Sequence, residues 1–110
     1  MRPEIACLMK HFYDDLKDHQ SVIQNRPAIR GIDKNLFFIN HNNPETNVDD
    51  GRSKRNEFEG NYAIQLAQYL IKQRYEPKQI TILVMYLGQR QFIAKQTKQI
   101  KLLQGARIMV

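Results

Sequence analysis

The chain has 110 residues, a net charge of +6 and a single cysteine. This length allows one modest domain. A lone Cys7 excludes an internal disulfide framework, so we expect an intracellular location, cytoplasmic or nuclear. The longest apolar run, residues 80–87, is far shorter than the roughly 20 residues that cross a bilayer, so no membrane partner is expected.

The excess of positive charge is confined to the C-terminal part of the chain. Residues 71–110 contain eight Lys or Arg and one acidic residue, whereas residues 1–70 contain nine and ten. Such asymmetry is typical of contact with a polyanion, because neutralising phosphates releases condensed counterions. A solvated basic face without a ligand explains the pattern equally well at this level.

Apolar spacing predicts the first elements. Residues 4–18 place large apolar side chains at three- and four-residue intervals, which predicts a helix that begins after Pro3. Residues 20–35 are rich in turn formers and predict a connection. Residues 36–39 are typical of a strand buried on both faces, and the polar residues 40–53 predict a long exposed loop.

Asn56 begins the next predicted helix. Its side-chain oxygen can accept from the backbone of Glu59 while the Glu59 side chain reaches back to Asn56, which is a capping-box arrangement. The helix carries two apolar stripes and is expected to end at Pro77, so it should be buried over a wide surface. The first stripe comprises Ala63, Ile64, Ala67, Leu70 and Ile71, and the second comprises Phe58, Tyr62, Leu66 and Tyr69.

The remaining segments alternate between strand and helix. Residues 80–84 are mostly β-branched, which predicts a central parallel strand, and Gly88 is expected to break it into a turn. A helix is predicted over residues 89–98, and a last strand over residues 106–110 follows Gly105. These segments predict an α/β fold with right-handed βαβ units on a parallel sheet.

Three motifs occur in one order along the chain. They are Met1-Arg2-Pro3-Glu4-Ile5, Ser53-x-x-Asn56-x-x-Glu59, and the strand 80–83 followed by Tyr86 and Gln89. In this order they resemble the second RecA-like domain of superfamily 1 helicases, closest to the NFX-type zinc-finger-containing RNA helicases and related to the nonsense-mediated-decay helicase. The resemblance implies a partial, truncated RecA-like sheet of the P-loop NTPase type, flanked by helices, as one incomplete domain over residues 1–110.

The resemblance implies a fragment of an ATP-dependent RNA helicase that contributes to nucleic-acid binding. ATP and Mg²⁺ are expected for the complete family protein, but no cofactor and no catalytic residue is assigned to this chain. It has no phosphate-binding loop of the G-x-x-x-x-G-K-[ST] form, and the family's arginine finger would precede Met1. The implied partners are RNA or single-stranded nucleic acid and the family's first RecA-like domain.

Two departures from the family pattern affect the expected site. Val84 and Met85 stand where the family has Thr and then Pro or Thr, which removes a hydroxyl that could meet a phosphate. Gly60 stands where the family has a helix-favouring Ala.

The candidate nucleic-acid contacts lie at the turn after the strand 80–84 and on the following helix. Ligands of parallel sheets lie at the carboxyl ends of strands, anions favour helix N-termini, and aromatic rings stack on unpaired bases. Phe92 is interpreted as a core side chain instead. The assigned contacts are Tyr86, Gln89, Arg90 and Lys95.

Two other interpretations remain beside the helicase resemblance. Cys7 and His11 have a spacing that suits two zinc ligands on one helix face, but two are too few, so no metal site is predicted. The alternative function is a non-enzymatic RecA-like or flavodoxin-like module whose two-striped helix docks a partner protein. A stable dimer or complex without RNA affinity would favour that alternative.

Overall fold

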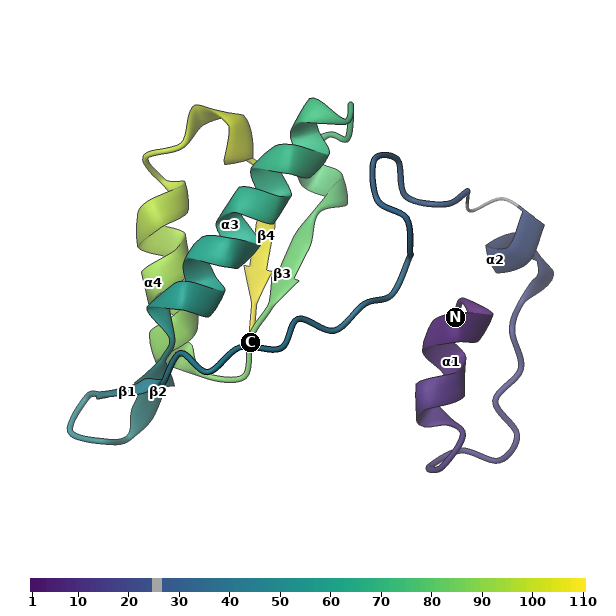
Figure 1. The fold of residues 1–110 in the computed structure, drawn as a ribbon, viewed down its shortest axis with the longest axis horizontal. Helices are drawn as coiled ribbons and strands as arrows, with labels where there is room; N and C mark the ends of the chain where they lie inside the picture. Colours follow the sequence, from purple (N-terminus) through teal and green to yellow (C-terminus); the bar gives the residue numbers. More distant parts are fainter. Residues whose placement is uncertain (25–26) are drawn as a thin grey trace. The chain divides into compact units, whose positions relative to one another are not determined.

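The computed structural model describes residues 1–24 and 27–110, and these residues form two compact units (Figure 1). The first unit is Met1–Asn40 and the second is His41–Val110. Residues 25–26, which fall within the predicted connection, lie outside the described residues. In the described parts of the chain, no helix is both long and apolar enough to cross a membrane.

The described residues of the first unit form two short helices. α1 (Pro3–Met9) has proline at its first position, where a missing N–H costs nothing, and α2 is Gln20–Gln24. The side chain of Asn35 links α1 to the segment that contains Ile29. Its side-chain nitrogen donates to Glu4 Oε1 (3.0 Å), and its side-chain oxygen accepts from the backbone N–H of Ile29 (2.9 Å).

Two predictions for the first unit are wrong. The helix predicted over residues 4–18 ends at Met9. Much of its predicted apolar stripe stays uncovered, since Leu8, Phe12 and Tyr13 are exposed, Phe12 to 77%. Residues 36–39 are irregular, and Phe38 is 91% exposed. A strand needs a neighbour for its backbone polar groups, and no described segment pairs with residues 36–39.

The second unit begins with a β-hairpin where the sequence predicted an exposed loop. β1 (Thr46–Val48) pairs antiparallel with β2 (Ser53–Arg55). The turn between them places residues 49–51 at positive φ, which Asp and Gly tolerate better than most residues. The turn formers in residues 40–53 therefore mark the tip of a hairpin.

α3 (Glu57–Lys72) is capped by Asn56 as predicted. Asn56 Oδ1 accepts from the backbone N–H of Glu59 at 3.1 Å. The reciprocal half of the predicted capping box is wrong. The backbone N–H of Asn56 donates to Gln89 Oε1 (2.8 Å), and Glu59 Oε1 pairs with His41 Nε2 (2.9 Å).

α3 ends at Lys72, before the predicted stop. Arg74 adopts a left-handed conformation (φ 72°), and the backbone N–H of Tyr75 donates to the carbonyl of Leu70 at 3.2 Å. This is the pattern of a Schellman motif, which closes a helix end through the backbone alone. Proline does not end α3; it begins the short 3-10 helix η1 (Pro77–Gln79).

A parallel βαβ unit completes the chain, as predicted. β3 (Thr81–Leu83) and β4 (Arg107–Met109) are parallel neighbours, joined by α4 (Leu87–Thr97) and the 3-10 helix η2 (Lys101–Leu103). Gly105 has φ 98° and turns the chain into β4. The described residues therefore form a small α/β arrangement.

The core of the second unit lies where α3 and α4 pack on one face of β3 and β4. Ile82 and Val84 pack against this core, whereas Leu83 and Met85, on the other face, are 74% and 86% exposed. The predicted central strand is therefore wrong: within the described residues β3 pairs with β4 alone. The buried core side chains are Ile64, Ala67, Ile80, Ile93 and Leu103.

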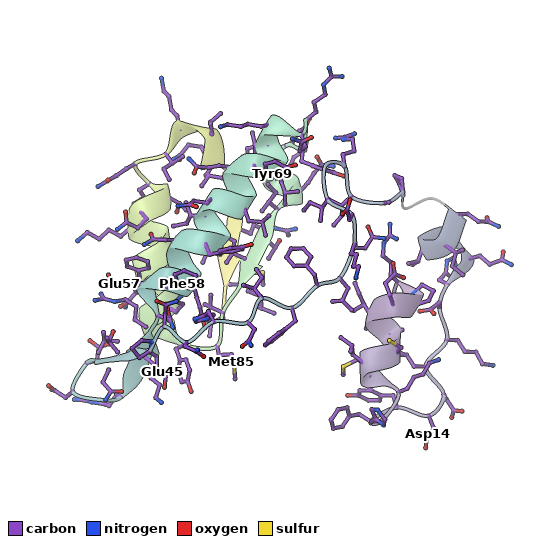
Figure 2. The ribbon with its side chains drawn as sticks, in the orientation of Figure 1. Asp14, Glu45, Glu57, Phe58, Tyr69 and Met85 are labelled. Carbon is purple, nitrogen blue, oxygen red and sulfur yellow. The ribbon has the colours of Figure 1, made fainter. Side chains whose placement is uncertain are left out.

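The two stripes of α3 have different surroundings. Ile64 and Ala67 of the first stripe are buried in the core, as predicted. Phe58 and Tyr69 of the second stripe are exposed near opposite ends of the helix (Figure 2), so the predicted burial is right for one stripe and wrong for the other. The exposed stripe belongs to the surface of the second unit.

Candidate nucleic-acid interface

Buried hydrogen bonds join the start of α3 to the start of α4. Ser53 Oγ accepts from the backbone N–H of Gly88 at 2.8 Å. Gln89 Oε1 accepts from the backbone N–H of Asn56 (2.8 Å), and Gln89 Nε2 donates to the Asn56 carbonyl (2.9 Å). These four residues, named the junction below, are buried, so water does not compete for their bonds. The junction fixes the two helix starts to each other.

Glycine at position 88 allows the hairpin and α4 to approach each other closely. A Cβ atom there would lie 2.5 Å from Val48 Cγ2 and 3.0 Å from both the Lys54 carbonyl oxygen and Ser53 Oγ. The expectation that Gly88 breaks the chain into a turn is wrong, because α4 begins at Leu87 and Gly88 lies in its first turn. Its role is to permit close packing. Figure 1 shows the hairpin beside the ends at which α3 and α4 begin.

A ring of hydrogen bonds attaches the incoming chain to the cap of α3. Asn56 Nδ2 donates to the Asn43 carbonyl (2.9 Å), and the backbone N–H of Asn43 donates to His41 Nδ1 (3.1 Å). Since Nδ1 accepts, a neutral His41 ring carries its proton on Nε2, which faces Glu59 Oε1 at 2.9 Å. The ring centroid of His41 also lies 4.8 Å from that of Phe58. Residues 41–43 are thus bonded to the first turn of α3.

A hollow of about 750 Å³ lies at the carboxyl ends of β3 and β4, and it is named the strand-end hollow. Tyr86 is half-exposed in its wall and occupies the N-cap position of α4. The hollow combines an aromatic ring, amide groups and cations with the carboxylates of Glu45 and Glu59 and a largely apolar wall. The ring and the cations are the groups that could bind an unpaired base and a phosphate. The polar lining of the hollow includes Glu45, Lys54, Arg55, Asn56, Tyr86 and Gln89.

The structure brings two of the four predicted contacts together. Tyr86 and Gln89 both line the strand-end hollow. The Gln89 amide is bonded through its oxygen and its nitrogen to Asn56 and is buried, so it builds the wall of the hollow. Arg90 is exposed, and its Nε donates to the Ile108 carbonyl at 3.3 Å. Lys95 does not line this hollow.

Lys95 lines a second hollow of about 490 Å³ between the hairpin and α4, named the flank groove. Phe92 also lines it while packing on the core, as predicted. The guanidinium of Arg55 lies 5.5 Å from the centroid of the Phe92 ring and pairs with Glu57 at 2.9 Å. Arg55 lines both hollows, a position that sequence reasoning missed. The sequence signal that could have identified Arg55 is its position directly before Asn56, the N-cap of α3.

Carboxylates near the hairpin neutralise some of its cations. Lys54 pairs with Glu45, and this hydrogen bond and charge raise the pKa of Lys54 above its ordinary value.

Met85 follows β3 in the lining of the strand-end hollow, and its side chain is largely exposed (Figure 2). No group of three or more His, Cys, Asp or Glu that could hold a metal ion occurs among residues 1–24 and 27–110.

Comparisons with known proteins place the chain among helicase relatives. A family model described as an AAA domain matches residues 1–109. Over its whole length the chain is 42% identical to NFX1-type zinc finger-containing protein 1 of Mus musculus and 40% identical to that of Homo sapiens. Over 86% of its length it is 36% identical to "Helicase required for RNAi-mediated heterochromatin assembly 1" of Schizosaccharomyces pombe. No solved structure matches the chain.

The chain spans a small part of these relatives, 6% of the two NFX1-type proteins and 9% of the yeast helicase. The resemblance to superfamily 1 helicases of the NFX-type group, drawn from three short motifs, is confirmed. By the match over residues 1–109, the chain belongs to the AAA-domain family that this model describes.

Proposed function

We propose that this chain is part of an ATP-dependent superfamily 1 RNA helicase, in which it belongs to the second RecA-like domain and contributes to nucleic-acid binding. The observation that carries the proposal is the junction, in which Asn56 and Gln89 of two different family motifs bond directly to each other. The junction adjoins the carboxyl ends of β3 and β4, and ligands of parallel sheets bind at such ends.

The residues of the interface have distinct roles in this proposal. Tyr86 stacks on an unpaired base, and Arg90 and Lys95 meet phosphates, because both cations are exposed on α4. Gln89 and Asn56 are positioning residues that hold the turn carrying Tyr86. The family's first RecA-like domain would supply the phosphate-binding loop for ATP and Mg²⁺. Because RNA is found in the cytoplasm and the nucleus, a cytoplasmic or nuclear location belongs to this proposal.

Binding of a fluorescent single-stranded oligouridylate, followed by anisotropy, tests the proposal. Tyr86→Ala should weaken binding by about 5- to 160-fold, since stacking on one aromatic ring is worth about 1–3 kcal/mol. Tyr69→Ala is the matched control, because Tyr69 and Tyr86 are both 41% exposed. Equal losses in the two variants, or no RNA binding by the unaltered chain, would contradict a site at Tyr86.

The exposed stripe of α3 favours one alternative, a non-enzymatic RecA-like or flavodoxin-like protein-interaction module. Phe58 and Tyr62 have ring centroids 6.3 Å apart on this stripe, and both are partly accessible to a partner. Light scattering on the purified chain separates the two functions. A stable dimer that Tyr62→Glu dissociates, without RNA affinity, favours the alternative, whereas a monomer that binds RNA favours the helicase proposal.

A further inference from the structure

Three lysines on and after α4 have no neutralising partner. Lys95, Lys98 and Lys101 are exposed and form no ion pair with the parts of the chain that the structure describes. Of the other cations of the second unit, three form ion pairs, whereas Arg52, Lys72, Arg74, Arg90 and Arg107 form none with the described residues. Lys54 pairs with Glu45, Arg55 with Glu57, and Lys78 with Glu76. The lysines 95, 98 and 101, named the lysine row, differ from the other unpaired cations in their regular three-residue spacing along one segment.

The helix dipole does not explain all three positions of the lysine row. A cation in the last turn of a helix is stabilised by the helix dipole, which accounts for Lys95. Lys98 is the C-cap residue and gains the same stabilisation, whereas Lys101 lies in η2 beyond α4 and is not explained by it. The intervals of three residues, at a rise of about 1.5 Å per residue within α4, keep neighbouring charges close together. Like charges so placed repel unless an anion binds them.

The flank groove next to the lysine row contains groups that suit a nucleotide. Lys95 belongs to both, and the groove adds the side chains of Gln91 and Gln96, whose amides can donate to and accept from base edges. Arg55 Nε in the same groove is buried and has no hydrogen-bond partner. A polyanion with flat, hydrogen-bonding bases uses all of these features, whereas a lipid headgroup uses the charge alone.

We propose that the lysine row and the flank groove form a second contact for single-stranded nucleic acid, separate from the contact at Tyr86. Lys95, Lys98 and Lys101 hold successive phosphates, and the groove receives a base. This inference rests on the proposed function, because it takes nucleic acid as the ligand of the chain. It adds a second surface along α4, which adjoins the strand-end hollow at Arg55 and extends to the C-terminal end of the helix.

The salt dependence of binding tests the second contact. For the full 110-residue chain, the affinity for a labelled single-stranded oligouridylate is measured at several salt concentrations. The triple variant K95Q/K98Q/K101Q should lower the slope of log affinity against log salt by about 2, since each phosphate contact to a single strand contributes about 0.7. At low salt its affinity should fall at least about tenfold.

A charge-matched control separates a local contact from net charge. The variant K10Q/K17Q/K34Q removes three exposed lysines of the first unit and should leave the slope unchanged. An equal fall in both triple variants, or an unchanged slope in K95Q/K98Q/K101Q, overturns the inference. Circular dichroism confirms that both variants fold, which is expected because all six side chains are exposed.

The outcomes distinguish this inference from the proposed function. If Tyr86→Ala weakens binding while K95Q/K98Q/K101Q leaves the slope unchanged, the second contact and the phosphate contact of Lys95 are wrong, and the base contact at Tyr86 stands. If only the triple variant has an effect, the second contact stands and the role of Tyr86 is wrong. Binding to phosphatidylserine vesicles through the lysine row, without RNA binding, would show that the partner is a lipid surface and overturn the inference.

Discussion

The side-chain amide of Gln89 bonds to both backbone polar groups of Asn56, at 2.8 Å from the N–H and 2.9 Å from the carbonyl. Asn56 caps α3, so Gln89 holds the cap in place from the first turn of α4. This also explains why Glu59 does not complete a capping box: the N–H that it would accept from is already bonded. Two motifs that lie far apart in sequence are thus one structural unit.

Gln89→Ala should destabilise the second unit by about 1–3 kcal/mol, because it leaves the buried N–H of Asn56 without a partner, whereas the Asn56 carbonyl keeps its bond from the N–H of Gly60 (3.0 Å). Gln89→Glu should restore only part of the stability, since a carboxylate can accept from the N–H but cannot donate to the carbonyl. Urea unfolding measures both variants. Gln91→Ala, an exposed change on the same helix, should stay within about 0.5 kcal/mol of the unaltered chain. A similar loss in Gln91→Ala would argue against the junction.

Gly60→Ala should destabilise the chain although alanine favours helices. A Cβ at position 60 would lie 2.7 Å from Cε1 and 2.8 Å from Cδ1 of Phe92, so the ring must move out of its contacts. Overpacking of this kind costs about 1–3 kcal/mol, against a gain of up to about 1 kcal/mol in helix propensity. The departure from the family's Ala at this position therefore matches the neighbouring Phe92. Thermal unfolding measures the change.

A double-mutant cycle checks that Phe92 causes this effect. In a Phe92→Leu background, Gly60→Ala should cost less or become stabilising, because a smaller side chain leaves room for the added methyl group. If Gly60→Ala has the same effect in both backgrounds, the close approach to Phe92 does not decide the choice of glycine.

Elements with local signals were predictable from the sequence. The cap of α3 follows from Asn56 directly before an apolar helical pattern, and the βαβ unit follows from the β-branched residues 80–84 and the glycine before residues 106–110. The motif spacing was sufficient to recognise the helicase relationship, which the comparisons confirm. The RecA-like arrangement and the nucleic-acid contacts stay predictions.

Features that depend on distant partners were not predictable. Residues 36–39 have the composition of a strand, but composition does not supply a neighbouring strand. The bonds of Gln89 to Asn56 and of Ser53 to Gly88 link residues more than thirty positions apart, so no local pattern reveals them. Similarly, the hairpin tip at residues 49–51 looks like any polar loop until its strands pair.

Gly88→Ala should loosen the hairpin from α4. The added Cβ would meet Val48 Cγ2 at 2.5 Å and the Lys54 carbonyl at 3.0 Å, and the backbone cannot yield without lengthening the bond from Gly88 to Ser53. We expect a loss of about 1–3 kcal/mol in unfolding free energy, together with faster amide hydrogen exchange at residue 88. Gly51→Ala is the contrasting variant. Nothing lies within 4 Å of its Cβ, so its cost comes from positive φ alone and residue 88 should stay protected.

The first unit should lose stability in acid through Glu4. The backbone N–H of Glu4 and then the Asn35 amide hold the pKa of its carboxyl below the ordinary value of 4.5. Because the folded pKa is the lower one, this stabilisation is present above pH 4.5 and is lost as the pH falls through the lowered pKa. A carboxyl carbon NMR titration should give a pKa below 4.5 for Glu4, and Asn35→Ala should move it part of the way back. Asn42→Ala in the second unit should leave it unchanged, and a pKa at or above 4.5 in the unaltered chain would rule out the Asn35 contact.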